Sequence, residues 1–506
     1  MDFWIKAAQL LLSLSILVVL HEFGHYLTAR YFKIRVEKFY LFFNPWFSLF
    51  KKKIGDTEWG IGWLPLGGFV KISGMIDESM DKEQMAQPAQ PWEFRSKPAW
   101  QRLIVMIGGV VVNVIVGVLI YILVLFAWGE EQVHSEDLSA GMAIHPYLAK
   151  YDLHSGDNIL KIDGNKVLSP RDVTNGLLLR DQHTLTVQKP DGSIKKVVLP
   201  DGIEYELFAE NALPVAGLRT QATEIHYLAS VKKVESIGIE AGDIVRKVNG
   251  IAVKNLDLND PSIKNAKKYE VLVKRDGKDI LIPIKSAQFN TFLKAFPCMA
   301  AGLRYQDRIV SINDEPIAYF DQVQSSLYRA KGKVEVKVLR QQDTLAFFIP
   351  VTKEHTIGFV PIDRGLVDSS AIQTISYSFG ASISHGTGQG MQTLSDYVSQ
   401  LKFLFTKKGA SSIGGFGAIG SMFPSQWDWQ IFWLNTALIS IILAFMNILP
   451  IPALDGGHVV FLLYEMITGK EAPQKVLEYA QYVGFFLLIG LVLYANGNDI
   501  YRWLAG

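Results

Sequence analysis

Four apolar segments, two near each end of the chain, set the strongest limit on what this sequence can fold into. Each approaches the about 20 residues that an α-helix needs to cross a lipid bilayer. The residues between the two pairs have the mixed polar character of a water-soluble region. The sequence therefore predicts a polytopic α-helical membrane protein with about four transmembrane helices, at about Trp4 to Tyr26, Leu103 to Trp128, Ile431 to Leu449 and Val476 to Tyr494.

Composition narrows the possible partners and metal ligands. The 506 residues carry a formal net charge of +1, so bulk electrostatics indicate no nucleic-acid partner. Cys298 is the single cysteine, which excludes an intrachain disulfide and a cysteine-rich zinc site. Any zinc ion must therefore be bound by histidine and carboxylate side chains.

Charged residues beside the spans predict the orientation in the membrane. Lysine and arginine are frequent between the first two spans, whereas the flank after the second span is acidic. This asymmetry predicts a cytoplasmic first connection, an extracytoplasmic central region and both termini on the outer side. Lys407 and Lys408 lie on the predicted outer side, so the flank of the third span is less decisive. The acidic residues are Glu130, Glu131, Glu136 and Asp137, and the basic ones are Arg30, Lys33, Arg35, Lys38, Arg95, Lys97 and Arg102.

A short pattern occurs three times in the central region. Gly156 to Gly164 recurs as Gly242 to Gly250 and as Gln306 to Asp314, each time as a turn, an alternating strand and a second turn. Another alternating strand follows, as at Tyr269 to Arg275 and Val334 to Leu339. The pattern resembles PDZ domains, which are small β-rich modules that bind extended peptides. An unrelated all-β region with similar hairpins is the alternative.

These features predict a division of the chain into membrane parts and inserted PDZ-like α+β domains. A linker with an amphipathic helix at Gln389 to Phe405 and a loop at Gly414 to Gly417 precedes the last two spans. The predicted parts are an N-terminal membrane part (1–128) with a hairpin at about 55–75, three PDZ-like units (129–225, 226–290 and 291–365), the linker (366–430) and a C-terminal membrane part (431–506).

The first apolar run, Ala7 to Leu20, is followed by no small-residue cleavage site and continues in helical register into the sequence His-Glu-Phe-Gly-His. It is therefore predicted to be a retained span. His21 and His25 are four residues apart, so both imidazoles face one side of a helix and can bind one metal ion. Glu22 can act as the general base on a water molecule at that ion. Two histidines satisfied by hydrogen bonds are the alternative, but ionisable groups in a span are costly without a function.

A catalytic zinc ion normally has three protein ligands, so a third ligand is expected in the other apolar region. Asp455 is the lone acid of a long apolar stretch, where Pro450 and Pro452 break the helix and the glycines after Asp455 allow the backbone to turn. His458 lies three residues further and is a competing ligand. We favour Asp455 and interpret His458 as structural.

At this point the sequence resembles the site-2 protease family of intramembrane zinc metalloproteases, in its bacterial regulator of sigma-E protease branch. The resemblance rests on His21 to His25, on Asn447 to Gly457 and on the PDZ-like insertion, and it covers essentially the whole chain. It implies that His21, His25 and Asp455 bind Zn²⁺ and that Glu22 is the general base. It also implies that Asn447 contacts the substrate backbone or the developing oxyanion, a role that suits an amide side chain.

Two further stretches are similar to elements of this family. Trp59 to Lys71 resembles its membrane-dipping β-hairpin, where a strand edge pairs with an unwound substrate, although a plain surface hairpin fits the residues equally well. Gly109 to Asn113 resembles its Gly-Pro-x-x-Asn element, with Val110 in place of proline. A third PDZ-like unit also exceeds the usual pair of the family.

The resemblance implies regulated intramembrane proteolysis in a bacterial inner membrane, with the active site near the cytoplasmic face. The expected substrates are single-pass membrane proteins, such as an anti-sigma factor or remnant signal peptides, after trimming by another protease. A non-catalytic membrane scaffold that presents PDZ-like modules is the alternative, but it would need none of the four active-site residues. A metal-ion transporter is a second alternative, and the internally repeated membrane halves common in transporters are not evident in this sequence.

Overall fold

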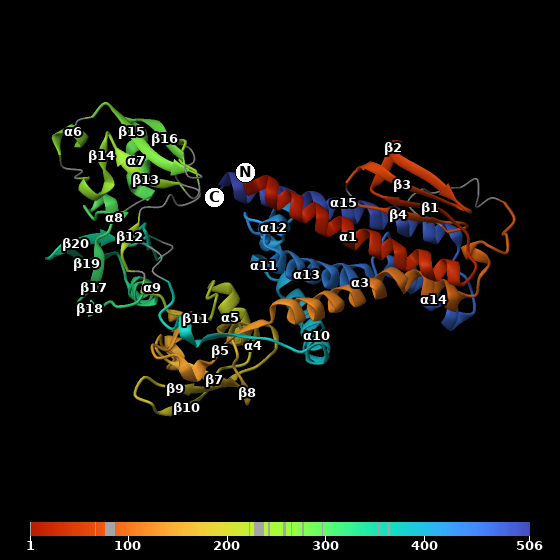
Figure 1. The fold of residues 1–506 in the computed structure, drawn as a ribbon, viewed down its shortest axis with the longest axis horizontal. Coiled ribbons are helices and arrows are strands. Elements are labelled where there is room, and N and C mark those ends of the chain that lie inside the picture. Colours follow the sequence, from red (N-terminus) through yellow and green to blue (C-terminus); the bar gives the residue numbers. More distant parts are fainter. Residues whose placement is uncertain are drawn as a thin grey trace. The chain divides into compact units, whose positions relative to one another are not determined.

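The chain divides into two compact units. We call Met1–Glu130 together with Ile375–Ile500 the helical unit, and Glu131–Thr374 together with Tyr501–Gly506 the β-rich unit (Figure 1). The computed structural model describes all residues except 1, 66, 76–86, 222, 227–236, 241–242, 257–259, 265, 276–277, 296, 353–354, 362–364 and 506.

Among the described residues, four helices are long and apolar enough to cross a membrane, which confirms the four predicted segments. They are α1 (Asp2–Tyr31), α3 (Ala99–Trp128), α13 (Trp429–Ile448) and α15 (Gln474–Ala505). Runs of leucine, isoleucine and valine form helices here because a span must satisfy its backbone polar groups within itself. α3 contacts both α1 and α13, so it is the centre of the helical unit.

Buried hydroxyl groups join α13 to the other two helices. Thr436 on α13 donates a hydrogen bond to Ser13 on α1, with 3.0 Å between the two oxygens. One turn further along α13, Ser440 donates a hydrogen bond of 2.7 Å to the backbone carbonyl of Asn113 on α3. Such contacts help to fix the register of helices that apolar packing alone would leave free to slide.

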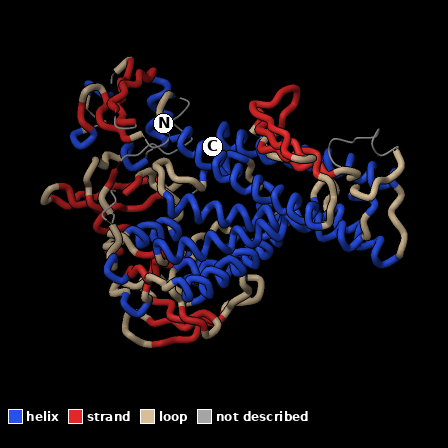
Figure 2. Tube along the Cα trace, turned by 45° about the vertical axis from the view of Figure 1, so that its right-hand side comes forward, coloured by secondary structure: helices blue, strands red, loops and turns tan. Residues whose placement is uncertain are grey.

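Residues 36–72 form a four-stranded sheet that lies beside the helices of the same unit (Figure 2). Its strands are β1 (Val36–Leu41), β2 (Phe43–Ile54), β3 (Thr57–Leu64) and β4 (Phe69–Ile72), in the order β2-β3-β1-β4. The predicted hairpin at about 55–75 is therefore different from the observed arrangement. β3 pairs in parallel with β1 and β4 pairs with the other side of β1, so β3 and β4 are not neighbours.

The predicted linker contains a longer helix than expected. α10 (Phe379–Leu404) begins ten residues before the predicted amphipathic helix, and it packs against α3. Glycines in its first half make this contact possible, because a Cβ on Gly386 would lie 2.7 Å from the Cα of Ile122. Of the predicted loop, Gly414 and Gly415 lie outside helices. The shorter α-helices of the helical unit are α11 (Lys407–Ser412) and α12 (Phe416–Ser421), which lie in the linker, and α14 (Asp455–Thr468), which lies after it.

In the β-rich unit, each of the three repeated segments forms a four-stranded sheet with the same strand order. Gly242 and the residues 227–236, near the predicted start of the second unit, lie outside the described residues. The first sheet contains β7 (Asn158–Ile162), β8 (Asn165–Lys166), β9 (Thr184–Gln188) and β10 (Ile194–Val198). The second contains β13 (Ile244–Val248), β14 (Ile251–Ala252), β15 (Lys268–Arg275) and β16 (Lys278–Lys285). The third contains β17 (Arg308–Ile312), β18 (Glu315–Pro316), β19 (Lys333–Arg340) and β20 (Asp343–Pro350). A helix follows the second strand of each sheet: α4 (Pro170–Leu179), α6 (Pro261–Lys264) and α9 (Phe320–Arg329).

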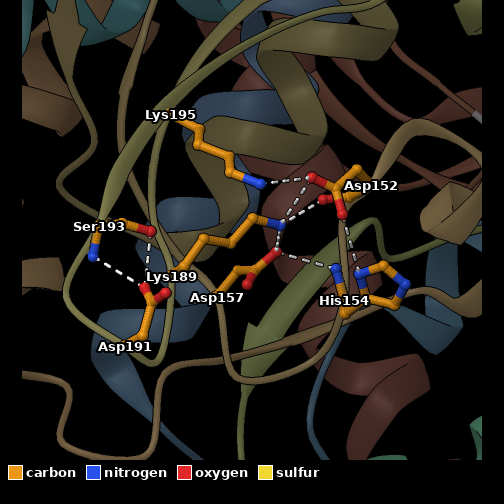
Figure 3. Close-up of polar contacts among 7 residues, drawn as sticks. All are labelled: Asp152, His154, Asp157, Lys189, Asp191, Ser193 and Lys195. Atoms are coloured by element: carbon orange, nitrogen blue, oxygen red, sulfur yellow. Dashed lines mark hydrogen bonds and ion pairs between the residues drawn. The ribbon is translucent and has the colours of Figure 1, made fainter.

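An aspartate at the same position of each repeat makes the same kind of contact, and this explains why the three repeats form the same turn. In the first repeat, Asp157 accepts a hydrogen bond of 3.0 Å from the backbone N–H of His154 and one of 2.9 Å from Lys189 (Figure 3). The Lys189 ammonium lies 3.6 Å from a second carboxylate, that of Asp152. A buried carboxylate is stable when it is paired in this way. The equivalent pairs are Asp243 with Arg275 and Asp307 with Arg340.

The turn after the first strand is also repeated. An aspartate or asparagine in this turn has a positive φ, which these residue types tolerate well. Its side chain accepts a hydrogen bond from a backbone N–H group of the third strand. The three acceptors are Asp163, Asn249 and Asn313, and their donors are the backbone N–H groups of Thr184, Glu270 and Glu335.

Two apolar cores hold the β-rich unit together. The first repeat has its own core, whereas buried residues between Ile225 and Ile357 form one continuous cluster that includes the second and third sheets. Three short pairs of strands are also described: β6 (Met142–Ile144) with β11 (Ala216–Leu218), β12 (Ile225–His226) with β21 (Val360–Pro361), and β5 (Glu130–Val133) with β22 (Ile372–Ile375). The remaining elements are η1 (Phe94–Ser96), η2 (Ser135–Asp137), η3 (Pro146–Tyr151), α5 (Ile203–Ala209), η5 (Val253–Asn255), α7 (Ser286–Ala295), α8 (Pro297–Ala300) and η6 (Ser369–Ala371).

Candidate metal centre

Two histidines on α1 point toward the same spot inside the helical unit. His21 and His25 are one helical turn apart, and 3.3 Å separates their Nε2 atoms. Both residues are buried. The four-residue spacing of the two histidines therefore places two imidazole nitrogens close enough together to bind one ion, as the sequence predicted.

Asp455 completes the group from the other end of the chain. Its Oδ2 atom lies 3.2 Å from His21 Nε2 and 3.4 Å from His25 Nε2. α13 ends at Ile448, and α14 begins with Asp455 after a short connection in which Ala453 has a φ of +75°. This connection directs the carboxylate back toward α1.

The glycines after Asp455 have a different role from the predicted one. Gly456 and Gly457 lie within α14, so they do not form the turn. They allow the helix to pack closely, because a Cβ on Gly456 would lie 2.1 Å from the carbonyl oxygen of Leu449. A Cβ on Gly457 would lie 2.7 Å from the carbonyl oxygen of Ile451. The close packing keeps Asp455 near the end of α13.

The separations of the three atoms fit a tetrahedral metal ion. Nitrogen and oxygen ligands at about 2.0–2.2 Å from a tetrahedral zinc ion stand about 3.3–3.6 Å from one another. The observed separations of 3.2, 3.3 and 3.4 Å are close to this range. The residues present therefore fit zinc, which is bound in proteins by this donor set.

Hydrogen bonding also leaves two of the three atoms, His25 Nε2 and Asp455 Oδ2, available for an ion. The Nδ1 atom of His25 lies 2.8 Å from the carbonyl oxygen of Val105. A carbonyl can only accept, so Nδ1 carries the proton and Nε2 keeps its lone pair. Asp455 Oδ2 is buried and accepts no hydrogen bond from the described residues. Burial of a carboxylate oxygen that accepts no hydrogen bond is costly, and a cation bound beside it would offset that cost.

Glycines bring the helices together around this group. A Cβ on Gly24, between the two histidines, would lie 2.4 Å from the carbonyl oxygen of Gly108 on α3. A Cβ on Gly109 would lie 2.5 Å from His25 Nε2 and 2.6 Å from His21 Cε1. The imidazole rings therefore occupy space that a side chain at position 109 would fill.

The three residues line a cavity of about 550 Å³, and Glu22 lies in its wall. Residues 69–72 of β4 form another part of the wall, together with Phe43, Asn44 and Met106. Helices α1, α3, α14 and α15 contribute further wall residues, and β4 is the last strand of its sheet, so it is an edge strand. An extended chain can therefore lie next to the candidate ligands.

The other two residues considered from the sequence lie at the edge of the group. The Nδ2 atom of Asn447, on the last turn of α13, is 3.3 Å from His21 Nε2. His458 lines the cavity, and its Nε2 atom is 3.4 Å from Nε2 of Gln481. Among the described residues, the group of close potential ligand atoms at this site contains Asp455 and does not contain His458.

Asn113 on α3 is a functional candidate to which sequence reasoning assigned no role. Its side chain is 1% exposed, and its Nδ2 atom lies 3.2 Å from His21 Nδ1. Two signals were available: the resemblance of Gly109 to Asn113 to the Gly-Pro-x-x-Asn element, and the position of a lone amide inside an apolar span. Such a side chain is costly in a membrane without a partner.

The sequence matches one protein family and is similar to bacterial proteins along almost its whole length. The profile of peptidase family M50 matches residues 9–491. A protein of Xylella fastidiosa is 28% identical over 99% of both chains, and one of Vibrio cholerae is 26% identical over 97% of both. A protein of Thermotoga maritima is 24% identical over 98% of both chains. Each of the three carries the name "putative zinc metalloprotease".

Proposed function

The chain belongs to peptidase family M50 and is a zinc metalloprotease, and from this we propose that it cuts single-pass membrane proteins within the membrane. We propose His21, His25 and Asp455 as the zinc ligands, Glu22 as the general base and Asn447 as a substrate-binding residue. The observation that carries this proposal is the group of three ligand atoms, 3.2–3.4 Å apart, in the wall of a cavity that is lined by residues of apolar helices and of the sheet of residues 36–72.

Each side chain has a defined task in this proposal. Zinc, when bound, supplies a Lewis acid that polarises the scissile carbonyl. Glu22, one residue after the first histidine and in the same cavity wall, takes a proton from the attacking water and passes it to the leaving amine. The amide of Asn447 donates a hydrogen bond to the substrate carbonyl as negative charge develops on its oxygen.

The substrate segment binds in extended form beside β4. A peptide bond inside a helix is shielded by its own hydrogen bonds, so a transmembrane substrate must unwind before hydrolysis. β4 supports this step because it is an edge strand, and its residues 69–72 line the cavity that contains the candidate ligands. Addition of a strand to such an edge is a common mode of peptide recognition.

The charge flanks support the predicted orientation in a bacterial inner membrane. Basic residues after α1 and acidic residues after α3 favour a cytoplasmic connection between the two helices. His21 and His25 are then near the cytoplasmic face, and the β-rich unit is extracytoplasmic.

The three repeats support the remaining part of the proposal. We propose that they are PDZ-like modules that exclude substrates with bulky outer domains. Substrates are then trimmed by another protease before they enter, as anti-sigma factors and remnant signal peptides would be. A non-catalytic scaffold would have no need for three ligand atoms at tetrahedral spacing.

The proposal is tested with a tagged single-span substrate in membranes and with zinc measured on each purified protein. We expect Glu22→Gln to retain zinc without cleaving, and Asp455→Asn to lose both zinc and cleavage. Asp137→Asn changes an exposed acid in the β-rich unit and serves as the matched control, with wild-type behaviour expected. Cleavage and zinc content unchanged in all variants would refute the assignment and favour the scaffold.

A further inference from the structure

The two ring nitrogens of His21 face different partners. Nε2 faces Asp455, His25 and the amide of Asn447, at 3.2, 3.3 and 3.3 Å. Nδ1, on the opposite side of the ring, faces the amide of Asn113, whose Nδ2 atom is 3.2 Å away. The state of Nδ1 decides whether Nε2 can bind an ion, because a neutral imidazole has one protonated nitrogen and one lone pair.

His25 has an unambiguous partner, whereas His21 does not. The carbonyl of Val105 accepts from Nδ1 of His25 and so forces its Nε2 to carry the lone pair. The partner of His21 is an amide, which can either donate or accept. If the Asn113 NH₂ group donates to Nδ1, the proton of His21 lies on Nε2 and that atom cannot bind an ion.

A half turn of the Asn113 amide resolves this conflict. The oxygen and nitrogen ends of an amide occupy nearly the same positions and are assigned from their hydrogen bonds. As placed, Asn113 Oδ1 is buried and accepts no hydrogen bond from the described residues. After a half turn, Oδ1 accepts from Nδ1–H of His21, so the buried acceptor gains a partner and Nε2 keeps its lone pair.

The surroundings of Asn113 hold it in place. Its backbone carbonyl accepts the hydrogen bond from Ser440 on α13, so two neighbouring helices fix its position. Gly109, one turn earlier on α3, leaves the space that the imidazole rings occupy. The amide group of Asn113 therefore meets His21 at a fixed position. Rotation about the last side-chain bond of Asn113 can still exchange its oxygen and nitrogen ends.

We propose that Asn113 is a positioning residue that accepts a hydrogen bond from Nδ1–H of His21 and thereby holds its Nε2 ready for zinc. The inference rests on the proposed role of His21 as a zinc ligand. Partners of this kind contribute about 10–100-fold to metal affinity when they orient a ligating histidine. Asn113 does not touch the ion or the substrate in this arrangement.

The test compares zinc affinity, measured by competition with a chelator, among full-length variants in detergent. Asn113→Leu removes the acceptor, and we expect it to weaken zinc binding about 10–100-fold. Asn113→Asp keeps an acceptor of the same shape, and we expect a loss smaller than about tenfold, which is below that range. Val111→Leu adds the same apolar side chain at an exposed position on the same helix and is the control.

The outcomes separate this inference from the proposed function. If His21→Ala retains zinc, the proposed ligand set is wrong and the inference falls with it. If His21→Ala loses zinc but Asn113→Leu binds it as wild type does, the inference alone is overturned. Equal losses in Asn113→Leu and Asn113→Asp would also overturn it, since they would indicate packing. If thermal melting shows that the Asn113→Leu protein is not folded at the assay temperature, Asn113→Val is measured in its place, and the same loss of zinc affinity is expected.

Discussion

Replacing Gly109 with alanine offers a sharp test of the candidate metal centre. The added Cβ would lie 2.5 Å from His25 Nε2, 2.6 Å from His21 Cε1 and 2.8 Å from His21 Nδ1. Non-bonded heavy atoms have their optimum separation at about 3.5 Å, so the rings or the helix must move by about 1 Å. Retreat of α3 from α1 is restrained because α13 and α10 also pack against α3, and Ser440 on α13 donates a hydrogen bond to the backbone carbonyl of Asn113.

The expected result is a large loss of both metal binding and cleavage. A displacement of about 1 Å at a catalytic group can cost about 100-fold in rate. The measurements are cleavage of a single-span substrate in membranes and zinc affinity of the purified protein. We expect both to fall in Gly109→Ala, while thermal melting shows that the helical unit remains folded.

Two glycine variants serve as controls for this prediction. Gly490→Ala is on α15, where an added Cβ meets no atom within 4 Å, so wild-type behaviour is expected. Gly117→Ala is on α3 but contacts the flexible end of Ile441 at 2.9 Å, so it disturbs packing away from the metal ligands. Wild-type zinc affinity and cleavage in Gly109→Ala would refute the geometry of the site. A loss in Gly117→Ala as large as in Gly109→Ala would show that helix packing, and not the ligands, is affected.

Two other predictions concern the packing of each unit. Arg219→Met leaves the buried carboxylate of Asp321 without its two hydrogen bonds, and we expect the free energy of unfolding of the β-rich unit to fall by about 3–5 kcal/mol in urea denaturation. Arg219→Met combined with Asp321→Leu should recover much of this loss, and a double variant as unstable as the single one would contradict the argument. Gly386→Leu forces α10 away from α3 at Ile122, so we expect faster proteolysis of α10 in detergent, whereas Gly388→Leu, where a Cβ meets no atom within 4 Å, should leave it unchanged.

Features encoded by short spacings could be predicted from the sequence. The spans follow from long apolar runs, and the shared face of His21 and His25 follows from the four-residue spacing on a helix. The repeated turns follow from a buried aspartate and a residue that tolerates a positive φ, as at Asp157 and Asp163. Each of these rules depends on contacts that recur at fixed distances along the chain.

Long-range packing explains the differences from prediction. The glycines of α10 disfavour an isolated helix, so the pattern indicated a helix only from Gln389 onward. In the structure, Gly386 is favourable because it lets α10 approach Ile122 on α3. A hairpin was predicted at about 55–75, whereas β3 and β4 both pair with β1, because alternation predicts strands but does not specify which strands pair.

The sequence by itself determined the number of spans, the two histidines with Glu22, and the need for a third ligand near Asp455 or His458. Only the tertiary structure decided that Asp455 reaches both histidines and that Asn113 meets His21 from a third helix. The physical reason is that both results depend on how α3, α13 and the connection before α14 pack against α1. Spacing along a helix is a local property, whereas the meeting of residues more than 400 positions apart depends on the packing of the whole helical unit.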